Sequence, residues 1–288
     1  MKPLPPPPHL RGAPPPRPRR PRPRTTGSHP ATLFSTGRGA DAERWIYGRH
    51  AVAAALDNPA RRWHHLAALA GQERDAHALV AAAAAPRRGE GEPIRVLDRI
   101  GLAAILPEGA VHQGLALAVE PLAELDLADV LRLASATAGR RVIVLLDQVS
   151  DPRNIGAVLR SAAAFGAVGV VVSLHGAPPV TGALAKAASG ALERVPLVRV
   201  VNLARALDRL KEGGFWVCGL DETAPQRLAA LDLGDQVAIV LGSEGGGMRR
   251  LVRERCDHLA RLPTRSAQAT INVSSAAAVA LYELARDA

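Results

Sequence analysis

The chain has only two cysteines, Cys218 and Cys256, among its 288 residues. Two cysteines are too few for a disulfide framework, and their spacing matches no paired-cysteine metal motif. We therefore expect no metal site and a reducing compartment, and we assign the protein to the cytoplasm.

The sequence also lacks long apolar runs. No run approaches the roughly 18 residues that a membrane-spanning helix needs, and the first residues lack the apolar segment of a secretory signal. Twelve of the first thirty residues are prolines, which excludes the amphipathic helix of a mitochondrial transit peptide. These absences favour a soluble, intracellular protein.

Aromatic residues make up only 3% of the chain, whereas apolar residues make up 48% and charged residues 22%. The core must therefore be built mainly from alanine, valine and leucine, and aromatic stacking is not expected to be the main way of holding a ligand. A length of 288 residues suggests one large domain or two modest ones.

Residues 1–43 form a proline- and arginine-rich tail that is predicted to be disordered, because such a composition cannot bury enough apolar surface. Seven of the 36 basic residues lie within residues 1–30, which leaves a net charge of only +2 on the remainder. The high pI is therefore not, by itself, a sign of a nucleic-acid-binding fold. The tail is a solvated extension, a translation start placed too early, or a weak contact for RNA; we favour one of the first two.

The rest of the chain divides into two α/β regions. Residues 44–120 are predicted to form a small domain, with strands at 94–97 and 115–119. Residues 121–139 are expected to be a linker with a short helix. From 140 to 288 apolar strands alternate with helices, which predicts a mostly parallel sheet covered on both faces. Ligands of such sheets bind at the carboxyl ends of the strands, so the loops at those ends are the candidate ligand sites.

The first of these loops follows an apolar strand at 142–146. Asp151-Pro152 interrupts the strand, Asn154 is expected to cap the next helix, and Gly156 allows close approach to the backbone. Arg160 follows one helical turn after the glycine, on the same face. A capped strand–helix turn followed by a surface arginine, without any catalytic role, would give the same sequence pattern.

The second loop is rich in glycine. Gly242, Gly245, Gly246 and Gly247 follow an apolar strand, with Glu244 among them. Glycine at this density indicates positive φ angles or close approach of a ligand to the backbone, although a flexible turn is an alternative. The loop is neither a P-loop nor a dinucleotide fingerprint, since the required spacings are missing.

The third loop runs from Leu262 to an alanine-rich helix, with Thr270, Ile271 and Asn272 directly before it. Threonine and asparagine at this position are ordinary N-cap residues. Alone, the segment predicts only a capped helix.

Taken in order, the three loops resemble the signature motifs of the SpoU/TrmH group of the SPOUT class, the RNA ribose 2′-O-methyltransferases. The pattern N-x-G-x-x-x-R begins at Asn154, G-x-E-G-x-G-M begins at Gly242, and the last motif corresponds to 270–274. Segments 46–52 and 109–114 are similar to landmarks of the group's N-terminal RNA-binding domain. The match is closest to the bacterial enzymes that methylate a guanosine ribose in large-subunit ribosomal RNA. The chain departs from the family at 263–266, where a usual methionine and glycine are replaced.

The resemblance implies a SPOUT-type parallel sheet with a C-terminal trefoil knot, a small N-terminal RNA-binding domain, S-adenosylmethionine as the cofactor, and a homodimer. Arg160 is implied as the main catalytic residue; we expect it to stay charged and stabilise the developing alkoxide, since deprotonating a guanidinium near neutral pH costs roughly 7 kcal/mol. The implied sites are catalytic (Arg160, Asn154, Glu244, Asn272 and Thr270), cofactor-binding (Gly242, Leu262, Ile271, Gly245 and Gly247) and RNA-binding (Arg49, His50, Arg61 and Arg62). His50 would equally suit a plain surface position. The alternatives are transfer RNA or another ribosomal RNA site as substrate, or a non-catalytic RNA-binding or ribosome-assembly factor that keeps the fold.

Overall fold

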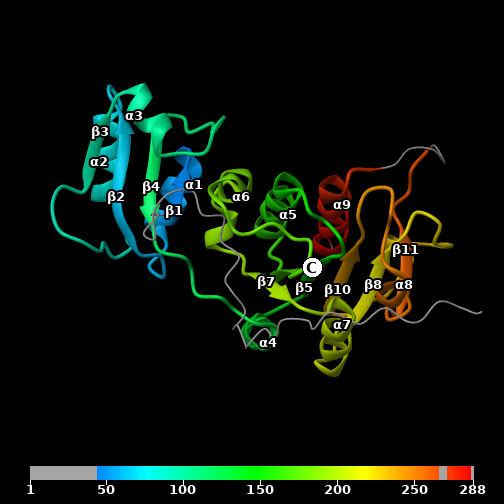
Figure 1. Cartoon of the computed structure of the whole chain (residues 1–288). Helices are drawn as coiled ribbons and strands as arrows, with labels where there is room; N and C mark the ends of the chain where they lie inside the picture. Colours follow the sequence, from blue (N-terminus) through cyan, green and yellow to red (C-terminus); the bar gives the residue numbers. More distant parts are fainter. Residues whose placement is uncertain (1–43, 266–270, 287–288) are drawn as a thin grey trace, which may run out of the picture. The chain divides into compact units, whose positions relative to one another are not determined.

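The computed structural model describes residues 44–265 and 271–286 (Figure 1). The predicted disordered tail, residues 1–43, and Thr270 lie outside these residues. Glu43–Ala288 form one compact unit that contains two β-sheets, one of four strands and one of seven. No helix in the described part is long and apolar enough to cross a membrane.

The N-terminal sheet has the strand order β1-β4-β2-β3. β4 is antiparallel to both β1 and β2, while β2 and β3 are parallel. β4 is buried along its whole length, as its unbroken apolar sequence predicts. The bounds are β1 (Arg44–Tyr47), α1 (Arg49–Asp57), β2 (Trp63–Leu69), α2 (Glu73–Ala81), β3 (Ile94–Leu97), α3 (Arg99–Ala104) and β4 (Leu115–Val119).

The C-terminal sheet has the order β7-β6-β5-β10-β8-β11-β9, and every pairing in it is parallel. The mostly parallel sheet expected from the sequence is thus confirmed, while the trefoil knot stays a prediction. The strands are β5 (Arg141–Leu146), β6 (Gly169–Ser173), β7 (Leu197–Val200), β8 (Trp216–Leu220), β9 (Gln226–Arg227), β10 (Gln236–Leu241) and β11 (His258–Arg261).

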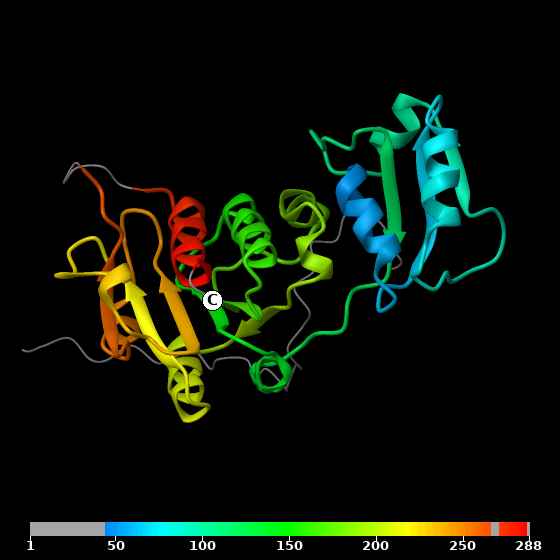
Figure 2. The same ribbon diagram turned by 180° about the vertical axis from the view of Figure 1, so that it is seen from behind.

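Helices cover both faces of this sheet (Figures 1 and 2). Val142, Val144 and Leu146 of β5 point into one core, and Ile143 and Leu145 into the other, because side chains alternate along a strand. The first core is closed by α5 (Pro152–Ala164), α6 (Gly182–Ala188), the 3-10 turn η1 (Ala191–Glu193) and α9 (Val273–Ala285), with η2 (Leu228–Ala230) nearby; the second is closed by α4 (Leu127–Ala136), α7 (Leu203–Glu212) and α8 (Arg250–Arg253).

α4 lies in the segment that the sequence predicts to be a linker. Its Leu127, Val130 and Ala134 are nevertheless buried in the second core, and a capping box at Asp126 fixes its start. This part of the expected linker is therefore packed against the C-terminal sheet.

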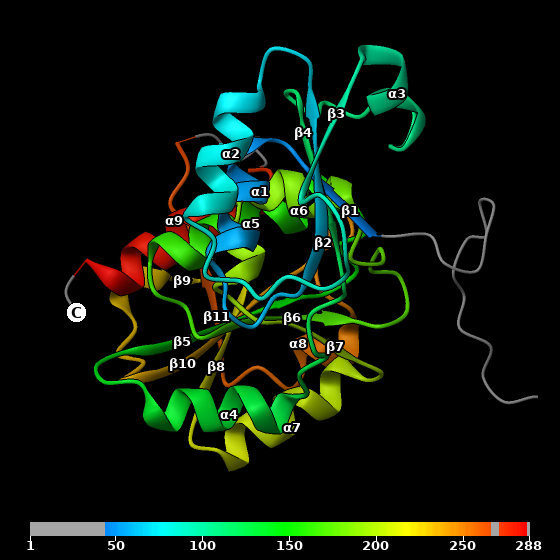
Figure 3. The same cartoon turned by 90° about the vertical axis from the view of Figure 1, so that its left-hand side faces the viewer.

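The three loops that carry the motifs follow β5, β10 and β11. β5 and β10 are neighbours, and only β8 separates β10 from β11. Because all these strands are parallel, their carboxyl ends lie at one edge of the sheet, which Figure 3 shows from the side. The fold thus brings the three loops to a common edge.

Candidate active site

One polar side chain from each of the three loops joins a single hydrogen-bonded cluster. The Asn272 amide nitrogen, Nδ2, donates to Asn154 Oδ1 at 3.1 Å and also to Glu244 Oε1. The Asn154 amide donates to the same Glu244 oxygen at 3.4 Å. Residues 118 and 90 positions apart in the sequence therefore meet at one point.

Asn154 reaches the cluster because it does not cap α5. The capping oxygen belongs to Asp151, which accepts from the Arg153 backbone N–H at 2.8 Å, and Pro152 occupies the first helical turn. The sequence-based expectation that Asn154 caps this helix is wrong. Its side chain, placed in the first turn, is free to bond to the other two loops.

The glycine-rich loop is closed on itself and presents Glu244 at its tip. Backbone hydrogen bonds join Ser243 and Gly247 in both directions, at 3.1 and 2.9 Å. Gly245 and Gly247 have φ angles of +78° and +61°, which favour glycine, and a Cβ on Gly242 would overlap the backbone of Gly247. The glycines therefore shape a tight loop.

Asn272 performs two tasks with its two amide atoms. Its Oδ1 caps α9 by accepting from the Ser274 backbone N–H at 2.9 Å and the Ser274 hydroxyl at 2.6 Å. Because that oxygen is fixed by the helix, the amide nitrogen must face Asn154 and Glu244. The ordinary N-cap expected from the sequence is thus confirmed and also orients the donor of the cluster.

An ion pair between a buried carboxylate and a partly exposed arginine links the first loop to the second. Asp147 follows β5 and is fully buried; its carboxylate accepts from the backbone N–H and the Nε of Arg249 at 2.7 and 2.8 Å. This pair holds the end of the glycine-rich loop. The pair was not predicted from the sequence, although an aspartate directly after a buried apolar strand needs a partner and was a usable signal.

The remaining C-terminal candidates differ in exposure. Arg160 is exposed on α5, one helical turn beyond Gly156. Ile271 is 38% exposed and Leu262 is half-buried. Arg265, within the segment that departs from the family, is exposed, and Thr270 lies outside the described residues.

Burial raises the pKa of the thiols of Cys218 and Cys256 to about 12, so neither is a thiolate at neutral pH. Within residues 44–265 and 271–286, no group of three or more histidine, cysteine, aspartate or glutamate side chains could hold a metal ion.

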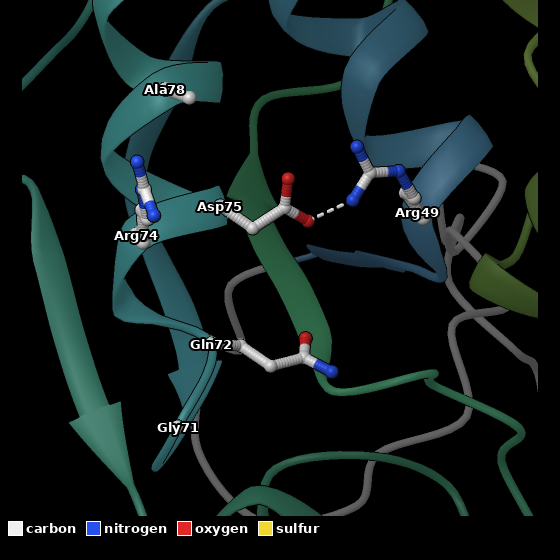
Figure 4. Close-up of a pocket in the computed structure, with 6 residues that line it drawn as sticks. All are labelled: Arg49, Gly71, Gln72, Arg74, Asp75 and Ala78. Carbon is white, nitrogen blue, oxygen red and sulfur yellow. Dashed lines mark hydrogen bonds and ion pairs between the residues drawn. The ribbon is translucent and has the colours of Figure 1, made fainter.

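The predicted RNA-binding residues differ in how far they are exposed to solvent. His50 and Arg49 are exposed, and Arg49 pairs with Asp75 beside a hollow of about 520 Å³ (Figure 4). Arg62 is also exposed, and its guanidinium nitrogen Nη1 lies 3.9 Å from Glu120 Oε2. Arg61 is different: its side chain is 4% exposed, with its guanidinium donating to Glu193 and to the Glu120 carbonyl. In this structure Arg61 has no free face for a phosphate.

Comparison with known proteins gives consistent results. Residues 141–282 match the model of the SpoU rRNA Methylase family, and residues 45–125 match that of RNA 2′-O ribose methyltransferase substrate binding. The chain is 38% identical over 241 residues to the 23S rRNA (guanosine-2′-O-)-methyltransferase RlmB of Coxiella burnetii, covering 84% of this chain and 94% of that protein. An uncharacterized tRNA/rRNA methyltransferase of Synechocystis is 36% identical over 241 residues; this chain covers 62% of its length.

Among solved structures, the SpoU methyltransferase AviRb of Streptomyces viridochromogenes, crystallised with S-adenosylmethionine, has the same fold. The TM-score is 0.69 at 23% identity, over 85% of this chain and 90% of that one. With the family models, the RlmB relative and the convergence of the three motifs, the conclusion is plain: the chain belongs to the SpoU family of S-adenosylmethionine-dependent RNA ribose 2′-O-methyltransferases.

Proposed function

We propose that this protein methylates the ribose 2′-hydroxyl of a guanosine in large-subunit ribosomal RNA. The observation that carries the proposal is the cluster of Asn154, Glu244 and Asn272, which joins all three motifs at the carboxyl edge of the parallel sheet. The choice of nucleotide follows the RlmB relative, which covers the same two regions of the chain.

The loops next to this cluster suit S-adenosylmethionine. Apart from the glycine itself and its two chain neighbours, no atom of a described residue lies within 4 Å of where a Cβ would stand on Gly245 or Gly247, so the loop backbone is open there. Leu262 and Ile271, in the third loop, are half-buried and exposed respectively and offer apolar surface. When bound, the cofactor supplies a methyl group on a good leaving group. Gly242, Gly245, Gly247, Leu262 and Ile271 are the residues that would hold it.

The chain's own contribution is then positioning and charge. Asn154, Glu244 and Asn272 hold the three loops together through their mutual hydrogen bonds. Thr270, two residues before Asn272 in the sequence, is proposed to act with them through its hydroxyl. Arg160, exposed on the helix that carries Asn154, binds a phosphate of the substrate with its planar fork and stabilises the negative charge that develops on the ribose oxygen.

Replacing Arg160 by lysine tests this role. Lysine keeps the charge but loses the two parallel donors, so we expect kcat for RNA methylation to fall at least about tenfold with unchanged cofactor affinity. Arg153→Lys, at an exposed arginine on the same helix, is the matched control and should leave kcat unchanged. Turnover of the Arg160→Lys variant close to wild type would refute the role.

The substrate is tested by mapping ribose methylations in total RNA from a deletion strain. We expect one missing methyl group, on a guanosine of large-subunit ribosomal RNA. A loss on transfer RNA or at another ribosomal site would replace the proposed substrate. No loss, together with no uptake of S-adenosylmethionine in calorimetry, would identify a non-catalytic RNA-binding factor instead.

We also propose that the enzyme is a homodimer and works in the cytoplasm, where its RNA substrate is made and assembled. Support for the dimer comes from α9, which leaves Val279 45% and Tyr282 57% exposed. Tyr282 packs edge-to-face on the partly buried Phe165 at the end of α5, so the two motif helices share an apolar surface.

A further inference from the structure

α6 and the turn after it, Gly182–Glu193, lie between the N-terminal sheet and the motif helix α5; Figures 1 and 2 show α1 on one side of α6 and α5 on the other. Two glycines permit the contact with the N-terminal region. A Cβ on Gly182 would come within 2.6 Å of the Tyr47 ring, and one on Gly190 within 2.6 Å of the Ala54 Cβ. Any larger residue at these positions would push the two regions apart.

A buried ion pair closes one end of this contact. Arg61 and Glu193 are each 4% exposed at their side chains; Arg61 Nε donates to Glu193 Oε2 at 3.1 Å, and a second guanidinium nitrogen donates to Oε1. The Asn58 amide donates to the same carboxylate at 2.8 Å. Burying two charges is costly unless their geometry is fixed, so such a pair defines an orientation rather than merely adding stability.

Lys186 closes the other end and explains two landmarks of the sequence. Its ammonium donates to Gln113 Oε1 and its stem lies over Gly48, leaving no room for a Cβ there. Gly48 belongs to the 46–52 segment and Gln113 to the 109–114 segment, and both have positive φ angles, +88° and +54°. Both landmark segments therefore contribute to this contact.

The opposite side of α6 packs on α5 just as closely. A Cβ on Gly156 would lie 2.5 Å from the Ala187 Cβ and 2.8 Å from the Ala188 nitrogen. Gly156 stands between Asn154 and Arg160 on α5. The glycine of the first motif thus admits α6 rather than a ligand, and a continuous chain of contacts leads from the N-terminal sheet to the active-site helix.

We propose that Gly182–Glu193 form a joint that holds the substrate-binding region at a fixed orientation to α5, and that Arg61 and Glu193 are positioning residues for RNA methylation. Only the expected effect on RNA methylation rests on the proposed function; the fixed orientation of the two regions does not. RNA bound to the N-terminal region then reaches Arg160 in one orientation, because α6 packs directly against both the N-terminal region and α5.

The test compares Arg61→Met, Glu193→Gln and the double variant with the wild-type enzyme. We expect each single variant to lower kcat/KM for RNA at least tenfold, while the Kd for S-adenosylmethionine changes less than twofold. The kcat/KM of the double variant should be at most twofold lower than that of the less active single variant, because both substitutions break the same ion pair. Arg132→Ala, which removes an exposed ion pair with Asp129 on α4, is the control and should leave kcat/KM unchanged.

Hydrogen–deuterium exchange provides a readout that does not depend on activity. Peptides from α1 and α6 should exchange at least tenfold faster in the single variants, with β5 and β10 peptides unchanged. If those variants do not fold, Lys186→Met, at a half-buried position, is measured in the same way, with a threefold or greater fall in kcat/KM expected. Wild-type kcat/KM and wild-type exchange in folded variants would overturn the joint. A wild-type protein that methylates no RNA would overturn the proposed function, and exchange would still decide the joint.

Discussion

At the scale of single residues, the active-site cluster depends on how one amide is oriented. Asn272 Oδ1 accepts hydrogen bonds in the first turn of α9, and its amide nitrogen donates to Asn154 and Glu244. Helix capping and site geometry are thus coupled in one side chain. The two functions can be separated by a substitution that preserves the oxygen and removes the donor.

Asn272→Asp is that substitution. Aspartate caps helices as well as asparagine, so we expect the thermal midpoint to stay close to wild type. Its carboxylate cannot donate, and it faces the carboxylate of Glu244, so kcat for RNA methylation should fall more than about tenfold. Asn272→Ala, which removes both functions, should lose activity and also about 1 kcal/mol of stability. An active Asn272→Asp enzyme would show that the amide donor is unnecessary.

At the scale of elements, the packing of α5 against α6 reverses the usual effect of a helix glycine. Replacing glycine by alanine within a helix normally stabilises it by roughly 0.5–1 kcal/mol. At Gly156 the new Cβ would stand 2.5 Å from Ala187 Cβ, so we expect Gly156→Ala to destabilise the protein by about 1–3 kcal/mol in urea unfolding. Gly101→Ala in α3, where the nearest atom is a side-chain oxygen at 3.1 Å, is the control. A stabilised Gly156→Ala variant would contradict the close packing.

The sequence predicted these loops but not what each residue in them does. Glycines and prolines after apolar strands mark the loops locally, and a parallel sheet brings them to one edge. Gly156 faces α6, which lies further along the chain, and Asp151 rather than Asn154 caps α5, so local spacing did not reveal either role. Arg61 and Arg62 are adjacent and of the same type, yet only Arg61 is buried. Its partner Glu193 is 132 residues away, so the local sequence carries no sign of this difference. β2 was missed because histidine and alanine weaken its strand signal.

At the scale of the whole molecule, the two sheets are joined by side chains that both regions supply. Arg61 and Asn58 come from the first region and Glu193 from the second, and all three meet where solvent is nearly excluded. Binding of RNA by one region therefore has a physical route to the catalytic helix. The exposed surface that α5 and α9 share has no such partner among the described residues of this chain.

That surface predicts the oligomeric state. Tyr282 is 57% exposed on α9, one helical turn beyond Val279, and packs on Phe165. Placing a charge there would bury an unpaired guanidinium in a dimer, so Tyr282→Arg should weaken dimerisation at least about tenfold, or 1.4 kcal/mol. Light scattering after gel filtration should show a dimeric wild type and a monomeric variant at micromolar concentration. Ile100→Arg, at an 81% exposed position on α3, is the matched control and should remain dimeric. A monomeric wild type would contradict the homodimer, and a dimeric Tyr282→Arg variant would place the interface elsewhere.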